Sequence, residues 1–316
     1  MNNHLGFSVE ELFHSLSPEF EETYQVLKYE MRGMKYLICD LINLWKLRGN
    51  IYHVTGDVHF LIPFLPYKKS ILTILDIGHF KNDLSGLKKI IYKFFWFTLP
   101  LKFAAQVTVI SKKTFDDVLK EFNFDIKKIS IVACSYGPDI KKNSKDFNSD
   151  FPNILQVGAH KLKNISRVAE ALEGLTCKIT IIGKLDPLQK SDLQRHNICF
   201  ENYYQLPRAD LLKHYEQADL VIFVSLEEGF GIPVLEAQAA GKPLITSKIS
   251  PMSDNAGFNA CLVDPYSVSE IKESLYKVIN DSVYRNQLIN DGLINVKRFT
   301  TKNIASEYIK IYKKII

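Results

Sequence analysis

Hydrophobic and polar positions alternate along the chain with two distinct periods. Short runs of β-branched and aliphatic residues are followed by longer segments in which apolar positions recur every three or four residues. The first pattern is typical of buried parallel strands and the second of amphipathic helices, so together they predict an α/β fold with parallel sheets. In the first half, strands are expected at residues 24–29, 51–55, 71–75, 106–110 and 129–132. Helices are expected between them at residues 8–20, 34–47, 87–95 and 112–121.

A polar stretch at residues 141–150 interrupts this alternation, which then begins again. We interpret the stretch as a linker between two Rossmann-like, parallel-sheet domains that face a central cleft. In the second half, strands are expected at residues 154–157, 178–182, 220–224, 243–246 and 261–263. Helices are expected at residues 165–172, 209–216, 233–240, 268–280, 283–290 and 302–316. The predicted organisation is an N-terminal domain at 1–147, a C-terminal domain at 148–300 and a last helix at 301–316 that packs back toward the N-terminal domain.

The composition argues against several classes of protein and site but does not indicate a function. The length of 316 residues is enough for two domains, and a net charge of only +5 gives no argument for a nucleic-acid partner. The five cysteines are far apart and form no C-x-x-C pair, which argues against a disulfide framework or a zinc site. No signal peptide is visible, and no apolar run reaches the roughly 20 residues of a membrane span. We therefore expect a cytoplasmic protein, soluble or peripheral at the cytoplasmic face of the membrane.

The segment at residues 221–243, VIFVSLEEGFGIPVLEAQAAGKP, carries the candidate chemistry. An apolar strand runs into a loop with Gly229 and Gly231, Pro233 suits the first turn of the next helix, and Gly241 suits its C-terminal cap. Backbone N–H groups at the start of such a helix form an anion site, and glycines let the backbone approach a diphosphate closely. Glu228 and Glu236 bracket this site. Carboxylates beside a phosphate site are expected to accept hydrogen bonds from hydroxyls, so the pattern predicts a nucleotide-sugar.

The same segment resembles the E-x7-E signature of the retaining glycosyltransferases with the GT-B fold, specifically glycosyltransferase family four, also called group 1. The match includes both glutamates, both glycines, the proline and the trailing G-K-P. The resemblance implies that Glu228 holds the hydroxyls of the donor sugar and that Glu236 holds the ribose. It implies that the backbone of Gly229, Phe230 and Gly231 binds the phosphates and the sugar. The structural alternative is a capped helix with two solvated glutamates.

The resemblance extends to the start of the C-terminal domain. Gly158 ends a strand and is followed by Lys161 and Lys163, as in the family loop that supplies cations to the diphosphate. Many members have an arginine directly after the glycine, where this chain has Ala159. Lys163 is the expected phosphate cation, Lys161 the second choice, and Lys184 a further candidate facing the same cleft. For each lysine the alternative is a solvated surface residue.

The N-terminal half matches the family less well. Family members often read T-x-H-D at a strand end where this chain has T-I-L-D, so only Asp76 is retained and Leu75 replaces the histidine. His79 or His59 would then supply the missing imidazole, unless these histidines only pack. Members also begin with a strand and a glycine loop, whereas this chain begins at essentially the first helix. Either the start of the sequence is truncated or mis-called, or the N-terminal domain lacks its first strand. The expected catalytic set is Glu228, Lys163, Asp76 and His79.

The function implied by the resemblance is transfer of a sugar from a nucleoside-diphosphate sugar to a hydroxyl acceptor, in bacterial surface polysaccharide assembly. No cofactor and no metal are expected, since no D-x-D occurs in the chain. The acceptor is expected to be a saccharide or to be linked to a lipid. The basic, aromatic stretch at residues 86–102 either contacts the inner membrane or is an ordinary helix that buries its aromatic residues. Two alternative functions are a nucleotide-sugar-binding subunit with weak or no activity and a GT-B epimerase or phosphorylase.

Overall fold

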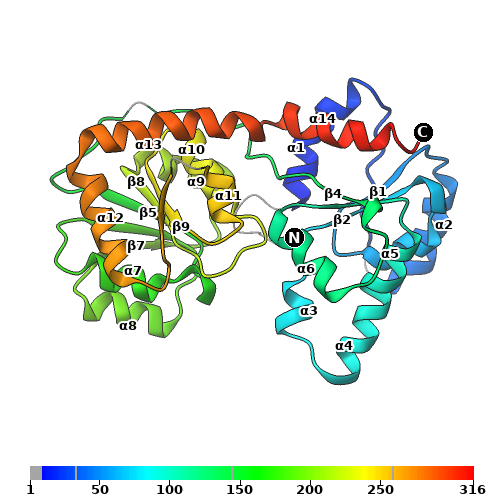
Figure 1. The fold of residues 1–316 in the computed structure, drawn as a ribbon, viewed down its shortest axis with the longest axis horizontal. Helices are drawn as coiled ribbons and strands as arrows, with labels where there is room; N and C mark the ends of the chain where they lie inside the picture. Colours follow the sequence, from blue (N-terminus) through cyan, green and yellow to red (C-terminus); the bar gives the residue numbers. More distant parts are fainter. Residues whose placement is uncertain (1–8, 33, 144, 258–259) are drawn as a thin grey trace. The chain divides into compact units, whose positions relative to one another are not determined.

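The computed structural model describes residues 9–32, 34–143, 145–257 and 260–316, which form two compact units (Figure 1). The N-terminal unit contains residues 9–134 together with 301–316, and the C-terminal unit contains residues 135–300. The division therefore lies between Cys134 and Ser135, and the last helix belongs to the N-terminal unit. None of the described helices has the length and hydrophobicity needed to span a bilayer.

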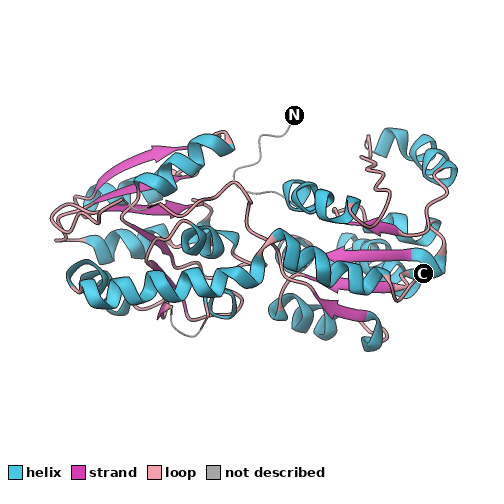
Figure 2. Ribbon diagram, turned by 90° about the horizontal axis from the view of Figure 1, so that it is seen from above, coloured by secondary structure: helices cyan, strands magenta, loops and turns pink. Residues whose placement is uncertain are grey.

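The C-terminal unit is built on a six-stranded parallel sheet in the order β10-β9-β8-β5-β6-β7. Its strands are β5 (Asn153–Val157), β6 (Lys178–Ile182), β7 (Cys199–Tyr203), β8 (Leu220–Phe223), β9 (Leu244–Ser247) and β10 (Cys261–Val263). Helices lie on both faces of the sheet (Figures 1 and 2). They are α7 (Ile165–Leu172), α8 (Pro187–Arg195), α9 (Arg208–Gln217), α10 (Ile232–Ala239), α11 (Met252–Ala256), α12 (Val268–Asn280) and α13 (Ser282–Asn295). Because successive strands are added outward on one side of β5 and then on the other, the strand order reverses between β5 and β8.

The N-terminal unit contains a smaller parallel sheet in the sequential order β1-β2-β3-β4. Its strands are β1 (Tyr52–Val54), β2 (Ser70–Ile74), β3 (Gln106–Val109) and β4 (Ile129–Ile131). Its helices are α1 (Val9–Glu21), α2 (Leu37–Lys46), α3 (Gly78–Asn82), α4 (Gly86–Tyr92), α5 (Leu99–Phe103), α6 (Lys112–Glu121) and α14 (Thr301–Tyr312), with a π-helical turn, η4 (Lys93–Thr98), between α4 and α5. Among the described residues no strand precedes β1, so the strand order of this sheet has no reversal.

One predicted strand is wrong, and one observed strand was missed. Residues 24–29 form a loop. The aromatic residues that suggested a strand there make side-chain contacts instead: Tyr29 donates a hydrogen bond to Asp40, and the ring of Tyr24 packs on Tyr312. The missed strand is β7, whose side chains are partly or fully exposed at the edge of the sheet. An edge strand of this kind has no buried apolar run from which it could be predicted.

A row of polar side chains crosses the N-terminal sheet beneath α14. His53 uses both ring nitrogens, since Nδ1 bonds the hydroxyl of Tyr312 at 2.8 Å and Nε2 bonds the hydroxyl of Thr73 at 2.7 Å. Thr73 in turn bonds Thr108 at 2.6 Å. The rings of Phe13 and Tyr308 pack on the imidazole, with centroids 5.2 and 5.3 Å from it. This row and its aromatic surround hold α1 and α14 against the sheet.

The pKa of His53 predicts how this unit responds to acid. Burial lowers the pKa to about 3, whereas an unfolded histidine titrates near 6.5. The native state therefore resists protonation, and the stabilisation present above about pH 6.5 is lost as the pH falls toward 3. Because the ring is only partly buried, we expect the free energy of unfolding of this unit to fall by about 1–2 kcal/mol between pH 7 and pH 5. Urea titrations of the wild type and His53→Gln at both pH values measure this; an equal fall in both proteins contradicts the assignment.

Candidate functional site

The reversal of strand order in the C-terminal sheet places two loops side by side. One loop follows β5 and the other follows β8, and in open parallel sheets ligands bind between such loops, at the carboxyl ends of the strands; we call this region the crevice. Asn164, which is buried and adopts a left-handed conformation with φ of 63°, joins the two loops. Its side-chain amide donates to the carbonyl of Val224 at 3.1 Å and to that of Pro265 at 2.7 Å. The loop that follows β5 is thus fixed relative to the end of β8.

Lys163 is the basic group of this crevice. Its backbone carbonyl accepts a hydrogen bond from the side chain of Gln156 at 3.0 Å, which fixes where the side chain begins. The aliphatic part of the side chain passes over Gly158, where an added Cβ would lie 2.7 Å from Cε of the lysine. Gly158 also has a φ of 91°, a conformation that favours glycine. The ammonium group ends above the ring of Phe223, 4.5 Å from the centroid.

Glu228 lies at the same point and pairs with this lysine. Its Oε1 accepts a hydrogen bond from Nζ of Lys163 at 2.5 Å, and the two side chains are 15% and 19% exposed. The expected cation and the expected sugar-binding carboxylate are therefore brought together, each as the counter-ion of the other. Both remain partly open to solvent, so a ligand that offers an anion and hydroxyls can reach them.

The start of α10 borders this pair. Gly231 is the N-cap with a φ of 85°, and Pro233 occupies the first turn, as the sequence predicts. The side chain of Phe230 is buried and packs on Phe299, so this residue presents only its backbone to a ligand at the helix start. Its carbonyl accepts a hydrogen bond from Asn255 at 2.7 Å, which fixes the loop from below. The helix start thus has the glycine geometry that suits a bound anion.

Glu236 is expected to hold the ribose, which requires an accessible carboxylate, but its side chain is only 2% exposed. One carboxylate oxygen accepts a hydrogen bond from Arg208 and the other accepts one from the hydroxyl of Tyr215 at 2.7 Å. Arg208 also donates two hydrogen bonds of 3.1 Å to Asp139. Burial alone would lower the pKa of Arg208, but the two carboxylates outweigh it and raise the pKa above its ordinary value. Burial and the nearby Glu236 likewise raise the pKa of Tyr215.

Arg208 was not predicted from the sequence, although a signal exists. It is the first residue of α9, directly after Pro207. A cation in the first turn of a helix is unfavourable with respect to the helix dipole, so an arginine there calls for an anionic partner. The two further lysine candidates, Lys161 and Lys184, are exposed, and neither forms a salt bridge with another described residue. They lie on the loops after β5 and β6 without a fixed position for the charged group.

The N-terminal candidates lie in a separate small hollow of about 200 Å³ within their own unit. It lies where the loops after β1 and β2 leave the sheet, and Asp76 and His79 are on its wall. Asp76 accepts a hydrogen bond from the backbone of Gly78 at 2.8 Å, and His79 contacts Asp83 at 3.0 Å. His59 is buried and bonded to a carbonyl, and burial lowers its pKa, so it is a packing residue at the base of this hollow.

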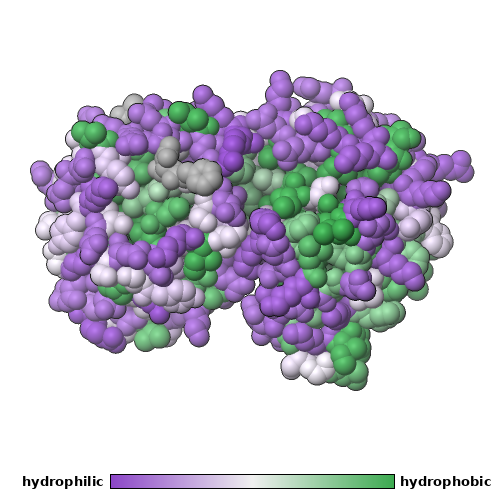
Figure 3. Space-filling model, viewed as in Figure 1, coloured by the Kyte–Doolittle hydropathy of each residue, from purple (hydrophilic) through white to green (hydrophobic). Residues whose placement is uncertain are grey.

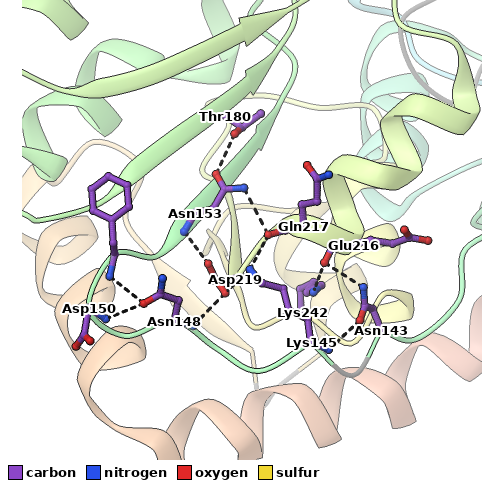
Figure 4. Close-up of polar contacts among 11 residues, drawn as sticks. Asn143, Lys145, Asn148, Asp150, Asn153, Thr180, Glu216, Gln217, Asp219 and Lys242 are labelled. Carbon is purple, nitrogen blue, oxygen red and sulfur yellow. Dashed lines mark hydrogen bonds and ion pairs between the residues drawn. The ribbon is translucent and has the colours of Figure 1, made fainter.

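A hollow of about 510 Å³ lies at the opposite edge of the C-terminal sheet, at the amino ends of the strands (Figure 4). Its centre is Asp219, whose carboxylate accepts hydrogen bonds from Lys145, from the backbone of Asn148 and from the backbone of Asn153. Figure 4 shows that these groups point toward one another across the chain segment that leads into β5. We interpret this region as a structural clamp for that segment. Among the described residues no cluster of three or more His, Cys, Asp or Glu is arranged to hold a metal ion.

The residues of the crevice lie in a part of the chain that matches a known protein family. The family of glycosyl transferases group 1 matches residues 139–293. The C-terminal unit therefore matches the group 1 glycosyl transferases over nearly its whole length. The matched region contains Lys163, Glu228, Glu236, Arg208 and Asp139. The whole of the crevice between the β5 and β8 loops is therefore inside the group 1 region, whereas the hollow of the N-terminal unit is outside it.

Individual relatives and solved structures agree with this assignment. An uncharacterized glycosyltransferase of Methanocaldococcus jannaschii is 27% identical over 237 residues, covering 66% of this chain and 60% of the relative. The O-antigen chain mannosyltransferase B of Escherichia coli is 30% identical over 108 residues, covering 34% of this chain and 28% of the relative. The chain thus aligns with less than two thirds of the length of either relative. Anabaena HepE, solved with UDP and glucose, has a TM-score of 0.71 at 14% identity, covering 96% of this chain and 89% of HepE. The similarity confirms the GT-B fold, with two Rossmann-like parallel-sheet domains.

Proposed function

We propose that this chain is a retaining glycosyltransferase that takes a sugar from a nucleoside-diphosphate sugar bound in the crevice between the β5 and β8 loops. The observation that carries the proposal is the pairing of Lys163 with Glu228 beside the start of α10. A diphosphate matches the ammonium group and the helix start, and sugar hydroxyls match the carboxylate. The names of the relatives support sugar transfer, and the structure of HepE with UDP and glucose supports this class of donor.

Donor binding replaces the internal ion pair with contacts to the ligand. The diphosphate takes the ammonium of Lys163, and Glu228 is released to accept hydrogen bonds from the sugar. For a ribose hydroxyl to reach Glu236, the guanidinium of Arg208 must first release its carboxylate oxygen, since the side chain is almost fully buried. We therefore assign Glu236 a contact with the ribose that depends on a movement of Arg208.

In the proposed reaction the bond between the anomeric carbon and the diphosphate oxygen breaks, and the bond to the acceptor oxygen forms on the same face of the sugar. The acceptor proton passes to the departing phosphate oxygen. Negative charge grows on the leaving diphosphate, so the fixed positive groups at the crevice lower the barrier. Lys163 and the start of α10 supply that positive charge from the chain itself, which supports a mechanism that does not use a metal.

The acceptor is proposed to be a saccharide or a lipid-linked saccharide, in the assembly of a bacterial surface polysaccharide. The name of the O-antigen mannosyltransferase supports this class of product. Asp76 and His79 remain the proposed acceptor-side residues, because they share the hollow at the carboxyl ends of β1 and β2. The five cysteines are all free, which supports a reducing compartment such as the cytoplasm.

A thermal-shift experiment with UDP-, GDP- and ADP-sugars tests the donor site. At a concentration of about 100 times Kd a ligand adds about 2.7 kcal/mol, so one nucleotide series is expected to raise the Tm of the wild type by several degrees. Glu228→Gln should reduce this shift to below half, because a neutral amide accepts fewer hydrogen bonds from sugar hydroxyls. The exposed Lys190→Met on α8 is the control and should behave as the wild type.

Two outcomes of this experiment separate the alternatives. If none of the nucleotide-sugars stabilises the protein, the donor site is wrongly placed. If one stabilises it, an activity assay with that nucleotide-sugar follows. If this assay detects no transfer or hydrolysis over many hours, the chain is a nucleotide-sugar-binding subunit and the catalytic proposal fails.

A further inference from the structure

The helix formed by α4 and η4 turns an apolar stripe outward, away from the core of its own unit. The stripe has the spacing of one helical face, and its members are strongly exposed: Leu87 at 71%, Ile90 at 66%, Ile91 at 50%, Phe94 at 47% and Phe95 at 47%. Figure 3 shows hydrophobic side chains gathered over α4 at the tip of the N-terminal unit. A contiguous exposed apolar surface of this kind marks a binding site.

The opposite face of the same helix already packs against the core of the unit, so the exposed stripe is not needed for that packing. Tyr92 and Trp96 stack at 4.8 Å, and Phe97 is buried against Phe122 at 4.5 Å. The π-helical turn at residues 93–98 places Phe94 and Phe95 together on the outside while the next two aromatic residues turn inward. The helix thus buries aromatic residues on one face and exposes others on the opposite face.

Charge indicates what covers this stripe. The chain contains no acidic residue between Asp83 and Asp116, whereas it contains six lysines there. Lys88 is exposed beside the stripe, whereas Lys89 and Lys93 lie on the inner side of the helix, with their ammonium groups near the buried ring of Phe80. The N-terminal unit as described has 21 Lys and Arg against 15 Asp and Glu, while the C-terminal unit has 19 against 20. An apolar stripe with an exposed lysine beside it, on a unit with excess positive charge and in a segment without acidic residues, matches an anionic lipid surface.

We propose that the outward stripe of α4 and η4 (Leu87, Ile90, Ile91, Phe94 and Phe95) docks this chain on an anionic lipid bilayer. The apolar side chains enter the boundary between headgroups and acyl chains, and Lys88 contacts the lipid phosphates. The inference extends the proposed function, on which it rests for the place of the acceptor, by assigning a surface that brings the chain to lipid-linked substrates. Tyr92 of α4 lines the same hollow as Asp76 and His79, so docking of the stripe places that hollow close to the bilayer.

Sedimentation with vesicles tests the surface without donor or acceptor, so this proposal and the donor proposal can fail separately. The whole chain is mixed with vesicles of phosphatidylglycerol and phosphatidylcholine, and in parallel with phosphatidylcholine alone. We expect at least tenfold tighter binding to the anionic vesicles, with affinity that falls as salt is added. Ile90→Ser/Phe94→Ser should bind at least tenfold more weakly than the wild type, and Lys88→Glu should weaken binding to anionic vesicles only.

The matched control is Ile38→Ser/Ile42→Ser on α2, which removes two other exposed apolar side chains of the same unit (74% and 45% exposed). This control should bind within threefold of the wild type, and all variants should keep the Tm of the wild type, since every changed residue is exposed. The proposal is overturned if the wild type binds neither kind of vesicle, or if the α2 control loses binding while the α4 variant keeps it. It is also overturned if the wild type forms dimers that Ile90→Ser/Phe94→Ser disperses and vesicles recruit neither protein.

Discussion

Replacing Lys163 by methionine is expected to lower kcat/KM for the nucleotide-sugar by about 10²–10³-fold, the loss typical of removing one fixed group that stabilises developing negative charge. Methionine keeps the length of the side chain that passes over Gly158 but removes the ammonium group. It also leaves the carboxylate of Glu228 without its counter-ion at the place where the diphosphate must bind. Repulsion between this carboxylate and the phosphates then adds to the lost attraction. Release of nucleoside diphosphate, with and without an acceptor, measures the effect.

Two further variants separate the charge from the local fold. Lys161→Met changes an exposed lysine on the same short helical turn and should alter kcat/KM by less than threefold. In the double variant Lys163→Met/Glu228→Gln, the losses should not add, because the two side chains act on each other in the free protein. The assignment is wrong if Lys163→Met keeps activity within threefold of the wild type, or if Lys161→Met is the more damaged of the two.

The strands and helices could be predicted where one local rule dominates. Buried parallel strands such as β6 and amphipathic helices such as α7 and α12 have the residues that their environment selects, and their predicted bounds are those observed. The failures lie where this link between burial and pattern is weak. Strand β7 pairs on one edge only and is partly exposed. The wrongly predicted strand at residues 24–29 has aromatic residues that contact α14 and Asp40, which are distant in sequence or on another helix.

Helix α8 was not predicted from the sequence, for a different reason. It begins with a capping box of Asp186 and Gln189 around Pro187, which is a readable start signal, but its apolar face is narrow. Among the site residues, Lys163 and Glu228 could be placed from their motifs, because the glycines and the proline dictate the backbone around them. Their direct contact and the burial of Glu236 could not, because both depend on which loops the reversal of strand order brings together. Arg208 contacts a carboxylate 28 positions away and another 69 positions away, and no local pattern contains that information.

Replacing Arg208 by alanine is expected to destabilise the C-terminal unit by about 3–5 kcal/mol, the typical cost of leaving one partner of a buried ion pair alone. Glu236 is 2% exposed, and among the described residues only the hydroxyl of Tyr215 would still bond its carboxylate without Arg208. The remaining charge cannot reach water without opening the packing around α10. Urea unfolding followed by the far-UV signal measures the loss, together with a probe specific to this unit.

The source of this loss can be located with three companion variants. In Arg208→Ala/Glu236→Gln the buried charge is also removed, so the double variant should recover most of the stability lost in Arg208→Ala. Asp139→Asn removes the exposed partner of the same arginine, 42% exposed, and should cost less than about 1 kcal/mol, as is usual for a solvent-exposed ion pair. Tyr215→Phe removes one hydrogen bond to a charged group and should cost about 1.5–3 kcal/mol. If Arg208→Ala and the double variant are equally unstable, the arginine acts through packing, and the unpaired carboxylate is not the cause. If the double variant recovers, the buried Glu236 holds α9 and α10 together only while it is paired, so a ribose that displaces Arg208 must itself supply hydrogen bonds to this carboxylate.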